Sequence, residues 1–479
     1  LDALARIKEY IAAGDTYQVN YTFKLLFELT GSPEALYRAL RRNQSVSYAA
    51  YLRNGDHRIL SFSPELFFRK EKGFCTVRPM KGTIRRGPSP AEDAKLAEQL
   101  RHDPKNRSEN VMIVDLLRND LGRVSLPGSV TTTSLFDVET YETLHQMTST
   151  IKGQLPANTD TATLFRALFP CGSVTGAPKI RTMEIIGELE PEPRGVYTGA
   201  IGYLAPDGGA VFNVPIRTVE LSGCQGTMGV GSGVVFDSQP EQEWQECLLK
   251  GRFLSDPAPA FQLIETLLWQ PGSGYWLLPK HLARLTVSAA HFLFSLNPAE
   301  IEERLAAMAG TFAQSCQRVR LTVAKDGALT LSAVECPPPT WATGLDAIPP
   351  PQAQLPCVAF SDKRIDPSWP WLFHKTTRRE LYDAERQQAT AAGLYEVLFT
   401  NTRGEATEGA ITNLYIQRDG MLLTPPVASG LLAGVLRQHL LTDPSLVVRE
   451  AVLTRKEVEE AQAVFVGNSV RGLVRVRVR

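Results

Sequence analysis

The pattern of hydrophobic and polar positions in the first half of the chain predicts short strands mixed with helices. Residues 19–27 (VNYTFKLLF) form an apolar run after Gly14-Asp15 and predict a strand. Residues 33–42 predict a helix, because Ser32 suits the N-cap position and Pro33 the first turn. The remaining helices are expected at 91–101 and 107–118, and the remaining strands at 201–203, 212–221 and 228–236.

A break in this pattern at residues 256–260 (DPAPA) predicts a linker, since two prolines among small residues disfavour both helix and sheet. A new pattern follows, with a strand expected at 261–269 and a helix at 282–296. A hairpin around Asp326-Gly327 is expected from 319–323 and 329–334. We therefore expect one domain at 1–255 and another at 261–479, both of the α+β class.

Composition narrows the class of protein. The chain has 479 residues, and 51 basic residues balance 51 acidic ones, which argues against nucleic-acid binding. It lacks any run of about 20 apolar residues, so we expect no membrane anchor. The 7 cysteines include no C-x-x-C motif and suit a reducing, cytoplasmic setting. The chain begins at Leu1 without Met, so we expect an N-terminal segment to be missing.

Three acidic residues are candidate ligands of a divalent metal. Glu243 and Glu246 are three residues apart and share one face of a predicted helix, and Glu109 lies in a separate helical stretch. Carboxylates from two helices, with no His or Cys motif beside them, suit Mg²⁺. On spacing alone, a solvated acidic helix face is the favoured explanation.

Other stretches suit an anionic small molecule. Residues 229–233 (GVGSG) can bring backbone N–H groups close to a carboxylate, and Thr175-Gly176 opens a loop that leads into a helix. Arg217 could bind a carboxylate through two parallel hydrogen bonds.

Taken together, residues 1–255 resemble the chorismate-binding domain shared by anthranilate synthase, aminodeoxychorismate synthase and isochorismate synthases. The stretches that carry the resemblance are GDTYQVN at 14–20, SPE at 63–65, PMKGT at 79–83, ENVMIVDLLRNDL at 109–121, ETLHQ at 142–146, 172–179, 197–202 and 231–246. The expected fold is the anthranilate synthase component I-like fold.

The resemblance implies a role for individual residues. Glu109 and Glu246 would hold Mg²⁺ against a chorismate carboxylate, and Glu243 would assist through water. His145 would lie near the substrate ring as a proton donor or acceptor. The residues implied in holding the substrate are Thr175, Gly176, Tyr197, Arg217, Gly231, Gly233 and Lys250. Lys250 could also be an ordinary surface lysine.

Lys81 and Asn106 distinguish this chain within that family. Lys81 matches the lysine that aminodeoxychorismate synthases use as a nucleophile, whereas anthranilate synthases have Ala there. A neutral amine could attack the ring and expel the C4 hydroxyl before ammonia displaces it. Burial, or the cations Arg85 and Arg86, would have to lower its pKa. A lysine that only pairs with substrate is the alternative. Asn106 stands where the family usually has an acid, so weaker metal binding is expected.

The second domain combines a lysine, an acid and a candidate phosphate-binding loop. Lys375 lies in FHKTT at 373–377, Glu408 precedes an apolar stretch, and the loop at 430–437 (GLLAGVLR) opens a predicted helix. These are the requirements of pyridoxal phosphate: an amine for covalent attachment, an acid for the pyridine nitrogen and an anion site.

Residues 261–479 resemble the class IV aminotransferases, with a two-lobed D-amino-acid aminotransferase-like fold, and within them aminodeoxychorismate lyase. By that resemblance Lys375 is the Schiff-base lysine and Glu408 the partner of the pyridine nitrogen. Arg284 and the backbone amides of Val435 and Leu436 would bind the phosphate. A homodimer through this domain is a further expectation of the resemblance.

Together the two resemblances imply conversion of chorismate and ammonia into 4-aminobenzoate and pyruvate. The chain has no G-x-C-x-G nucleophile motif, so ammonia is expected from a separate glutamine amidotransferase subunit. Two other functions fit less of the sequence. One is an anthranilate or isochorismate synthase fused to an amino-acid transaminase. The other is a non-catalytic scaffold, against which the presence of Lys81, Lys375 and Glu408 argues.

Overall fold

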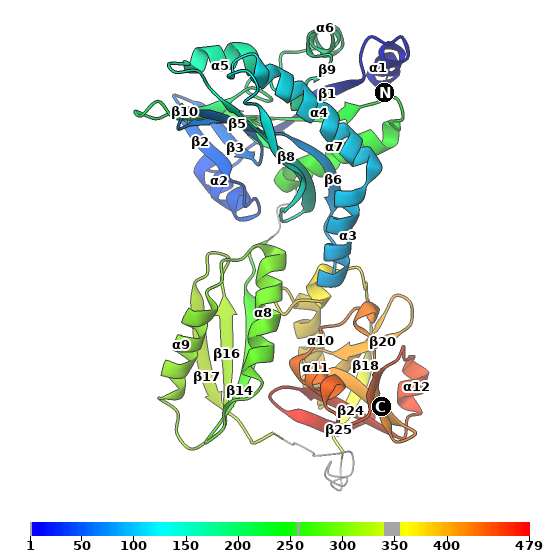
Figure 1. The fold of residues 1–479 in the computed structure, drawn as a ribbon. Coiled ribbons are helices and arrows are strands. Elements are labelled where there is room, and N and C mark those ends of the chain that lie inside the picture. The colour runs from blue at the N-terminus through cyan, green and yellow to red at the C-terminus, as the bar shows by residue number, and fades with distance from the viewer. Residues whose placement is uncertain (1, 256–258, 340–354) are drawn as a thin grey trace. The chain divides into compact units, whose positions relative to one another are not determined.

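The computed structural model describes residues 2–255, 259–339 and 355–479, and the chain divides into two units. Unit 1 comprises 1–86 and 94–259, and unit 2 comprises 87–93 and 260–479. The centre of the expected linker, 256–258, lies outside the described residues. Each unit mixes helices and sheets (Figure 1), as the α+β class predicts. No helix in the described ranges has both the length and the apolar character needed to cross a membrane.

Unit 1 contains two mainly antiparallel sheets. The six-stranded sheet has the order β2 (Tyr48–Asn54), β3 (His57–Ser63), β12 (Thr218–Ser222), β13 (Gln225–Val234), β1 (Gln18–Glu28) and β9 (Gly176–Ala177). The other has the order β10 (Ile201–Leu204), β11 (Ala210–Asn213), β4 (Leu66–Glu71), β5 (Phe74–Arg78), β8 (Leu144–Gln154) and β6 (Met80–Arg85), and β7 (Thr131–Thr140) also pairs with β8.

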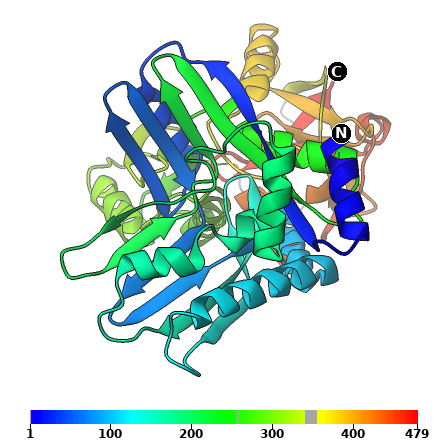
Figure 2. The same ribbon diagram turned by 90° about the horizontal axis from the view of Figure 1, so that it is seen from above.

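Helices cover these sheets through apolar faces. The long helix α4 (Pro104–Gly122) packs along β6 and β8, and Figure 2 shows it in cyan beside its sheet. Its residues Ile113, Val114 and Leu117 are buried in a core with Phe67 and Phe68. The remaining helices of this part of the chain are α1 (Asp2–Ala12), α2 (Pro33–Arg42), α3 (Pro90–His102), α5 (Thr161–Leu168), α6 (Lys179–Leu189) and α7 (Pro240–Ser255).

Strand pairing brings three candidate segments together. In the antiparallel pair of β1 and β13, Asn20 lies opposite Gly233 and Thr22 opposite Gly231. β9 extends the same sheet on the other side of β1, where Gln18 pairs with Ala177. The glycine-rich strand and the Thr175-Gly176 loop therefore flank one strand, β1.

Unit 2 has two lobes. Its smaller sheet has the order β15 (Gly274–Tyr275), β14 (Leu263–Gln270), β16 (Gln317–Val323) and β17 (Leu329–Glu335), with α8 (Leu278–Phe292) and α9 (Pro298–Ala309). The eight-stranded sheet has the order β20 (Ala406–Gly409), β19 (Glu396–Asn401), β18 (Cys357–Ile365), β25 (Gly472–Val478), β24 (Ala463–Asn468), β21 (Asn413–Arg418), β22 (Met421–Thr424) and β23 (Val448–Glu450). Its helices are α10 (Glu380–Ala391), α11 (Val435–Thr442) and α12 (Arg455–Glu459).

Most predicted elements are confirmed with shifted ends, and one is wrong. The helix at Pro33–Arg42 is confirmed, and its cap is the Ser32 hydroxyl, which accepts from the Ala35 amide at 3.3 Å. The single strand predicted at 212–221 is instead β11 and β12, which belong to different sheets. Pro215 has no N–H for a ladder, and Arg217 adopts a left-handed conformation with φ of 49°, so the strand breaks between them.

Candidate active sites

Lys81 projects from β6 toward strands β1 and β13. Its Nζ donates to the Asn20 side-chain oxygen at 3.3 Å. A Cβ on Gly233 would lie 2.9 Å from Lys81 Nζ and would also collide with the Gln18 amide. Gly233 thus leaves space for these polar groups, and any side chain there would displace the lysine.

Burial lowers the pKa of Lys81, and Lys250 adds to the effect, while the carboxylates of Glu109, Glu246 and Glu65 oppose it. Burial therefore acts as the sequence predicted, but the assisting cation is Lys250. The guanidinium groups of Arg85 and Arg86 donate to the Arg86 and Tyr141 carbonyl oxygens at 3.3 and 2.7 Å.

Glu65 is an acid to which the sequence analysis gave no role. It is only 3% exposed, and burial raises its pKa to about 7 although Ser173, Lys81 and Lys250 act to lower it. Its Oε1 is buried without a hydrogen-bond partner in the structure. A carboxyl group with a pKa near neutrality beside a buried amine can deliver a proton at a reacting atom. The SPE motif at 63–65 was the only sequence signal.

The three candidate metal ligands come from α4 and α7. Burial raises the pKa of Glu109, and the charges of Glu246 and Glu243 act in the same direction, whereas those of Lys81 and Lys105 oppose it. Burial acts to raise the pKa of Glu246, but Lys250, together with Lys81 and Lys105, outweighs it and lowers that pKa. Lys250 Nζ lies 2.6 Å from Glu246 Oε1. Glu243 Oε1 accepts from the Ser238 hydroxyl at 2.6 Å.

Within the described part of the chain, no group of three or more His, Cys, Asp or Glu side chains is arranged to hold a metal. Two carboxylates completed by water and substrate oxygens are nevertheless the usual protein contribution to a Mg²⁺ site. Glu109 and Glu246 fit that donor set. Asn106 is engaged elsewhere, because its Nδ2 donates to the N-cap residue Asp103 at 2.8 Å and its oxygen faces Gly82.

Arg217 and Tyr197 are each packed against neighbouring side chains or glycines. Burial lowers the pKa of Arg217, whose guanidinium donates to Gln44 Oε1 at 2.9 Å and lies 5.8 Å from the Tyr141 ring centroid. The Tyr197 ring packs over Gly229, where a Cβ would overlap it. The Gly231 carbonyl accepts from Lys250 Nζ at 2.9 Å, so Lys250 is tied to both the glycine strand and Glu246.

Thr175, Gly176 and His145 are held by local contacts. Thr175 Oγ1 donates to the Cys171 carbonyl at 3.2 Å, and Gly176 has φ of 151° where a side chain would strike the Gln18 carbonyl. His145 is 2% exposed, with Nδ1 3.0 Å from the Thr140 hydroxyl. The Thr175-Gly176 loop leads into a helix as expected, since Pro178 is the N-cap and α6 begins at Lys179.

Lys375 lines a cavity of about 1280 Å³ in unit 2. Its segment is fixed to β14, because the Ile264 amide donates to the Lys375 carbonyl at 2.8 Å. Burial lowers the pKa of Lys375 to about 7, assisted by the charges of Arg284 and Arg379. The amine is therefore available in its neutral, nucleophilic form near neutral pH.

Glu408 lines the same cavity and is 7% exposed. Burial raises its pKa to about 8, although hydrogen bonds from Leu432 and Tyr382 act to lower it. Tyr382 donates to Oε1 and Asn413 Nδ2 to Oε2, both at 3.2 Å. These two bonds fix the plane of the carboxyl group, as an acid that pairs with a ring nitrogen requires.

Arg284 is held by Glu265, a residue that the sequence analysis missed. Arg284 donates to the two Glu265 oxygens at 2.9 and 2.6 Å, and His281 Nδ1 lies 2.6 Å from Glu265 Oε2. The charges of Arg284 and His281 overcome the effect of burial and lower the pKa of Glu265 to about 2. The bidentate pair leaves the other edge of the guanidinium to face the cavity, which Arg284 lines.

The start of α11 also borders this cavity. Gly434 is its N-cap and Val435 its first residue, and both line the cavity, whereas Leu436 is buried behind them. A Cβ on Gly434 would overlap the Asn413 amide. Basic side chains outnumber acidic ones in the lining: Arg284, Arg318, Arg320, Lys375, Arg378, Arg379, Arg386 and Arg471 against Glu335, Glu380, Asp383 and Glu408. The lining therefore favours anions, and with Lys375 and Glu408 it fits pyridoxal phosphate.

Comparison with known proteins agrees with both units. Residues 1–256 match the chorismate binding enzyme family, and residues 262–478 match the class IV amino-transferase family. The chain is 44% identical over 248 residues to aminodeoxychorismate synthase component 1 of Bacillus subtilis, covering 52% of this chain and 53% of that protein. It is 43% identical over 252 residues to anthranilate synthase component 1 of Streptomyces coelicolor, covering 52% of this chain and 49% of that protein.

Among solved structures, anthranilate synthase component I from Streptococcus pneumoniae is similar at 35% identity with a TM-score of 0.49, covering 53% of this chain and 56% of that one. The chain thus spans about half the length of the curated relatives it matches. Both family matches agree with the sequence-based resemblances and with the expected two-domain fold. The chain belongs to the chorismate binding enzyme family and carries a class IV amino-transferase domain after it.

Proposed function

We propose that the chain makes 4-aminobenzoate in two steps: amination of chorismate to 4-amino-4-deoxychorismate in unit 1, then release of pyruvate in unit 2. The observation that carries the proposal is the Lys81 amine, which is held by Asn20 and has a lowered pKa, together with Glu65, which has a pKa of about 7 and whose charge acts on that amine. Overall similarity does not decide between the aminodeoxychorismate and anthranilate activities, since relatives named for each match almost equally.

The first step uses groups of unit 1 alone. The lone pair of Lys81 Nζ forms a bond to a ring carbon, and the displaced electrons expel the C4 hydroxyl. Glu65 gives that hydroxyl its proton, so it leaves as water. Ammonia then bonds to C4, and the bond from the ring to the still protonated Nζ breaks, so that its electron pair returns to lysine and Lys81 leaves as the neutral amine. The new C4 ammonium group gives its extra proton back to the Glu65 carboxylate.

Mg²⁺ would be held by Glu109 and Glu246, with Glu243 acting through water, and would offset the charge of a substrate carboxylate. His145 is proposed to exchange a proton near the ring. Thr175, Gly176, Tyr197 and Lys250 are proposed to complete the pocket around the substrate.

Pyridoxal phosphate bound in unit 2 would supply an electron sink for breaking the C4–H bond of the aminated ring. Arg284 and the amides of Val435 and Leu436 would bind its phosphate, and Glu408 would bind its pyridine nitrogen. Lys375 would take the proton from C4, which its pKa of about 7 permits. The basic lining would hold the two carboxylates of the substrate.

Ammonia is proposed to come from a separate glutamine amidotransferase subunit, since the sequence has no amidotransferase nucleophile motif. A cytoplasmic location and a homodimer through unit 2 complete the proposal. Glutamine alone should then give no product with the purified chain, whereas high ammonium should.

The deciding experiment is product identification. The purified chain, incubated with chorismate, Mg²⁺, ammonium and pyridoxal phosphate, should yield 4-aminobenzoate and equimolar pyruvate. Lys81→Ala should yield neither, while 4-amino-4-deoxychorismate supplied to that variant should still be converted. Formation of anthranilate, or amino-group transfer to a keto acid, would support a synthase fused to a transaminase. The native chain mixed with pyridoxal phosphate should show an absorbance band that Lys375→Ala lacks. If the native chain shows no such band, a non-catalytic scaffold would be supported.

A further inference from the structure

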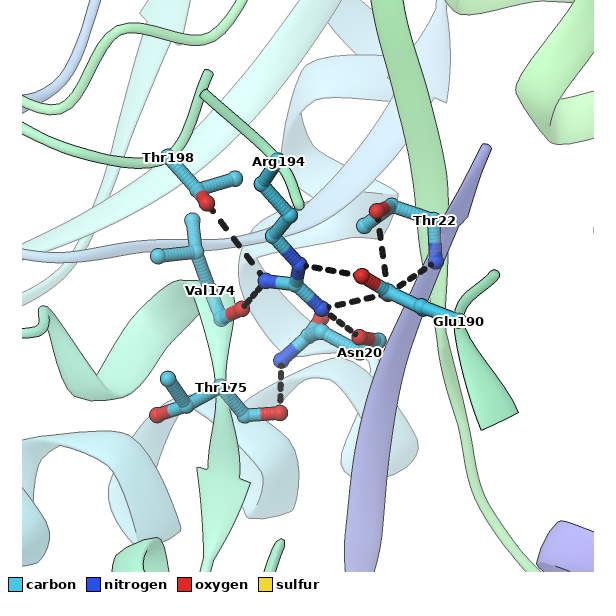
Figure 3. Close-up of polar contacts among 7 residues, drawn as sticks. All are labelled: Asn20, Thr22, Val174, Thr175, Glu190, Arg194 and Thr198. Atoms are coloured by element: carbon cyan, nitrogen blue, oxygen red, sulfur yellow. Dashed lines mark hydrogen bonds and ion pairs between the residues drawn. The ribbon is translucent and has the colours of Figure 1, made fainter. Parts of the chain in front are cut away.

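Arg194 lies in the loop after α6 and uses all five of its N–H donors on the protein. Nε and Nη2 donate to the two Glu190 oxygens at 2.8 and 2.7 Å. Nη2 also donates to the Asn20 carbonyl at 2.7 Å, and Nη1 to the Val174 carbonyl at 2.8 Å and to Thr198 Oγ1 at 3.5 Å. Figure 3 shows the guanidinium enclosed by these groups. A saturated guanidinium has no donor left for a substrate.

The network fixes the backbone on both sides of Asn20. The Asn20 amide and the Asn20 Nδ2 both donate to the Thr175 carbonyl, at 2.7 and 3.1 Å. Glu190 Oε1 accepts from the amide and the hydroxyl of Thr22, both at 2.9 Å (Figure 3). Arg194 and Glu190 therefore clamp β1 to the Val174-Thr175 segment at the residue that contacts Lys81.

The clamp determines which atom of the Asn20 amide faces Lys81. Because Nδ2 is occupied by the Thr175 carbonyl, Oδ1 is turned to Lys81 Nζ at 3.3 Å. In the part of the chain that the structure describes, Lys81 makes no other side-chain hydrogen bond. A neutral amine that donates one N–H to a fixed acceptor has its lone pair directed elsewhere. A neutral carbonyl oxygen does this without the rise in pKa that a carboxylate would cause.

We propose that Arg194 is a positioning residue for Lys81, acting through Asn20 to aim the lysine at the ring. The inference rests on the proposed amination reaction, because it gives Arg194 a purpose only if Lys81 attacks the substrate. Arg194 itself touches neither the substrate nor the amine.

The test measures the bond from Lys81 to the substrate directly. Chain lacking added ammonia is mixed with chorismate and Mg²⁺, and the rate of mass gain at Lys81 is followed by intact and peptide mass spectrometry. Arg194→Lys keeps the charge, but the lysine has three N–H donors in place of five. It also lacks the planar guanidinium that donates two parallel hydrogen bonds to a carboxylate. We expect about a 10- to 100-fold slower attachment with little change in the KM for chorismate. Arg181→Lys is the matched control, since Arg181 lies on α6 with partly exposed partners Asp15 and Glu184.

A double-mutant cycle separates positioning from general damage. If Arg194 acts through Asn20, then Arg194→Lys should slow attachment strongly in the native chain but hardly at all in an Asn20→Ala background. The inference would be overturned if the fold-reductions in attachment rate of the two single variants multiplied in the double variant. An unchanged attachment rate in Arg194→Lys would also overturn it. No attachment in the native chain would instead overturn the proposed function, and the inference with it.

Asn20→Asp guards against a folding artefact. Its carboxylate would join those of Glu65, Glu109 and Glu246 in raising the Lys81 pKa, against Lys250. Attachment should therefore be slower than in the native chain at neutral pH, while thermal unfolding is unchanged. A native rate of attachment in this variant would count against the proposed contact.

Discussion

Lys375 and Glu408 line one cavity, and burial lowers the pKa of the lysine to about 7 and raises the pKa of the acid to about 8. The usual wide gap between the pKa values of an amine and a carboxyl group is thereby closed. Near neutral pH the pair can hold its proton on the acid and leave the amine neutral. This is the state that covalent attachment of an aldehyde cofactor needs.

The rate of cofactor attachment should therefore depend on pH in an unusual range. In cofactor-free protein, the neutral fraction of Lys375 rises as the pH passes about 7, so the rate should increase to that point and then level off. An unperturbed lysine would keep gaining rate up to about pH 10. Absorbance growth after mixing with pyridoxal phosphate measures this. Arg379→Gln should move the midpoint upward, because the Arg379 charge helps to lower the Lys375 pKa.

The control for that shift is Arg455→Gln, which removes a cation paired with Glu459 on the exposed face of α12 and should leave the midpoint unchanged. A midpoint near 10 in the native protein would contradict the lowered pKa of Lys375.

Glu65 should make the chorismate reaction fail at high pH. A carboxyl group with a raised pKa keeps its proton below that pKa, so the acid form is lost as the pH rises through about 7. Attachment of the ring to Lys81, measured without ammonia, should decline over the same range. Glu65→Gln keeps the shape but cannot give a proton, and should slow attachment by about 10²- to 10⁴-fold. An unchanged rate in this variant would assign the proton to another group.

Arg217 should govern substrate affinity. The chain holds its guanidinium between Gln44 and Tyr141, and Arg217→Lys would lose the planar fork that binds a carboxylate through two bonds. We expect the KM for chorismate to rise about 10- to 100-fold, with a smaller change in kcat. Steady-state kinetics with saturating ammonium would measure both. A fall in kcat at constant KM would place Arg217 in the chemical step instead.

The sequence could predict the groups whose chemistry stands out locally but not those defined by long-range contacts. Lys81, Lys375 and Glu408 lie in short motifs, and the Ser32 cap and the helix after it follow from local rules. Glu65, Glu265 and Arg194 do not, because each acts through partners distant in sequence, such as Arg284 for Glu265. The break of the predicted 212–221 strand was also missed, since an apolar run continues across two sheets that only the tertiary fold separates.

The metal site offers the last prediction. Glu109→Gln and Glu246→Gln should each raise the Mg²⁺ concentration needed for half-maximal amination, by about 10- to 100-fold, because each removes a charged oxygen ligand. Glu243→Gln should have a smaller effect, since its carboxylate already accepts from Ser238 and would act only through water. Titration of amination against Mg²⁺, with thermal unfolding as the control for folding, measures all three. Equal effects at the three positions would contradict a site built on two direct ligands.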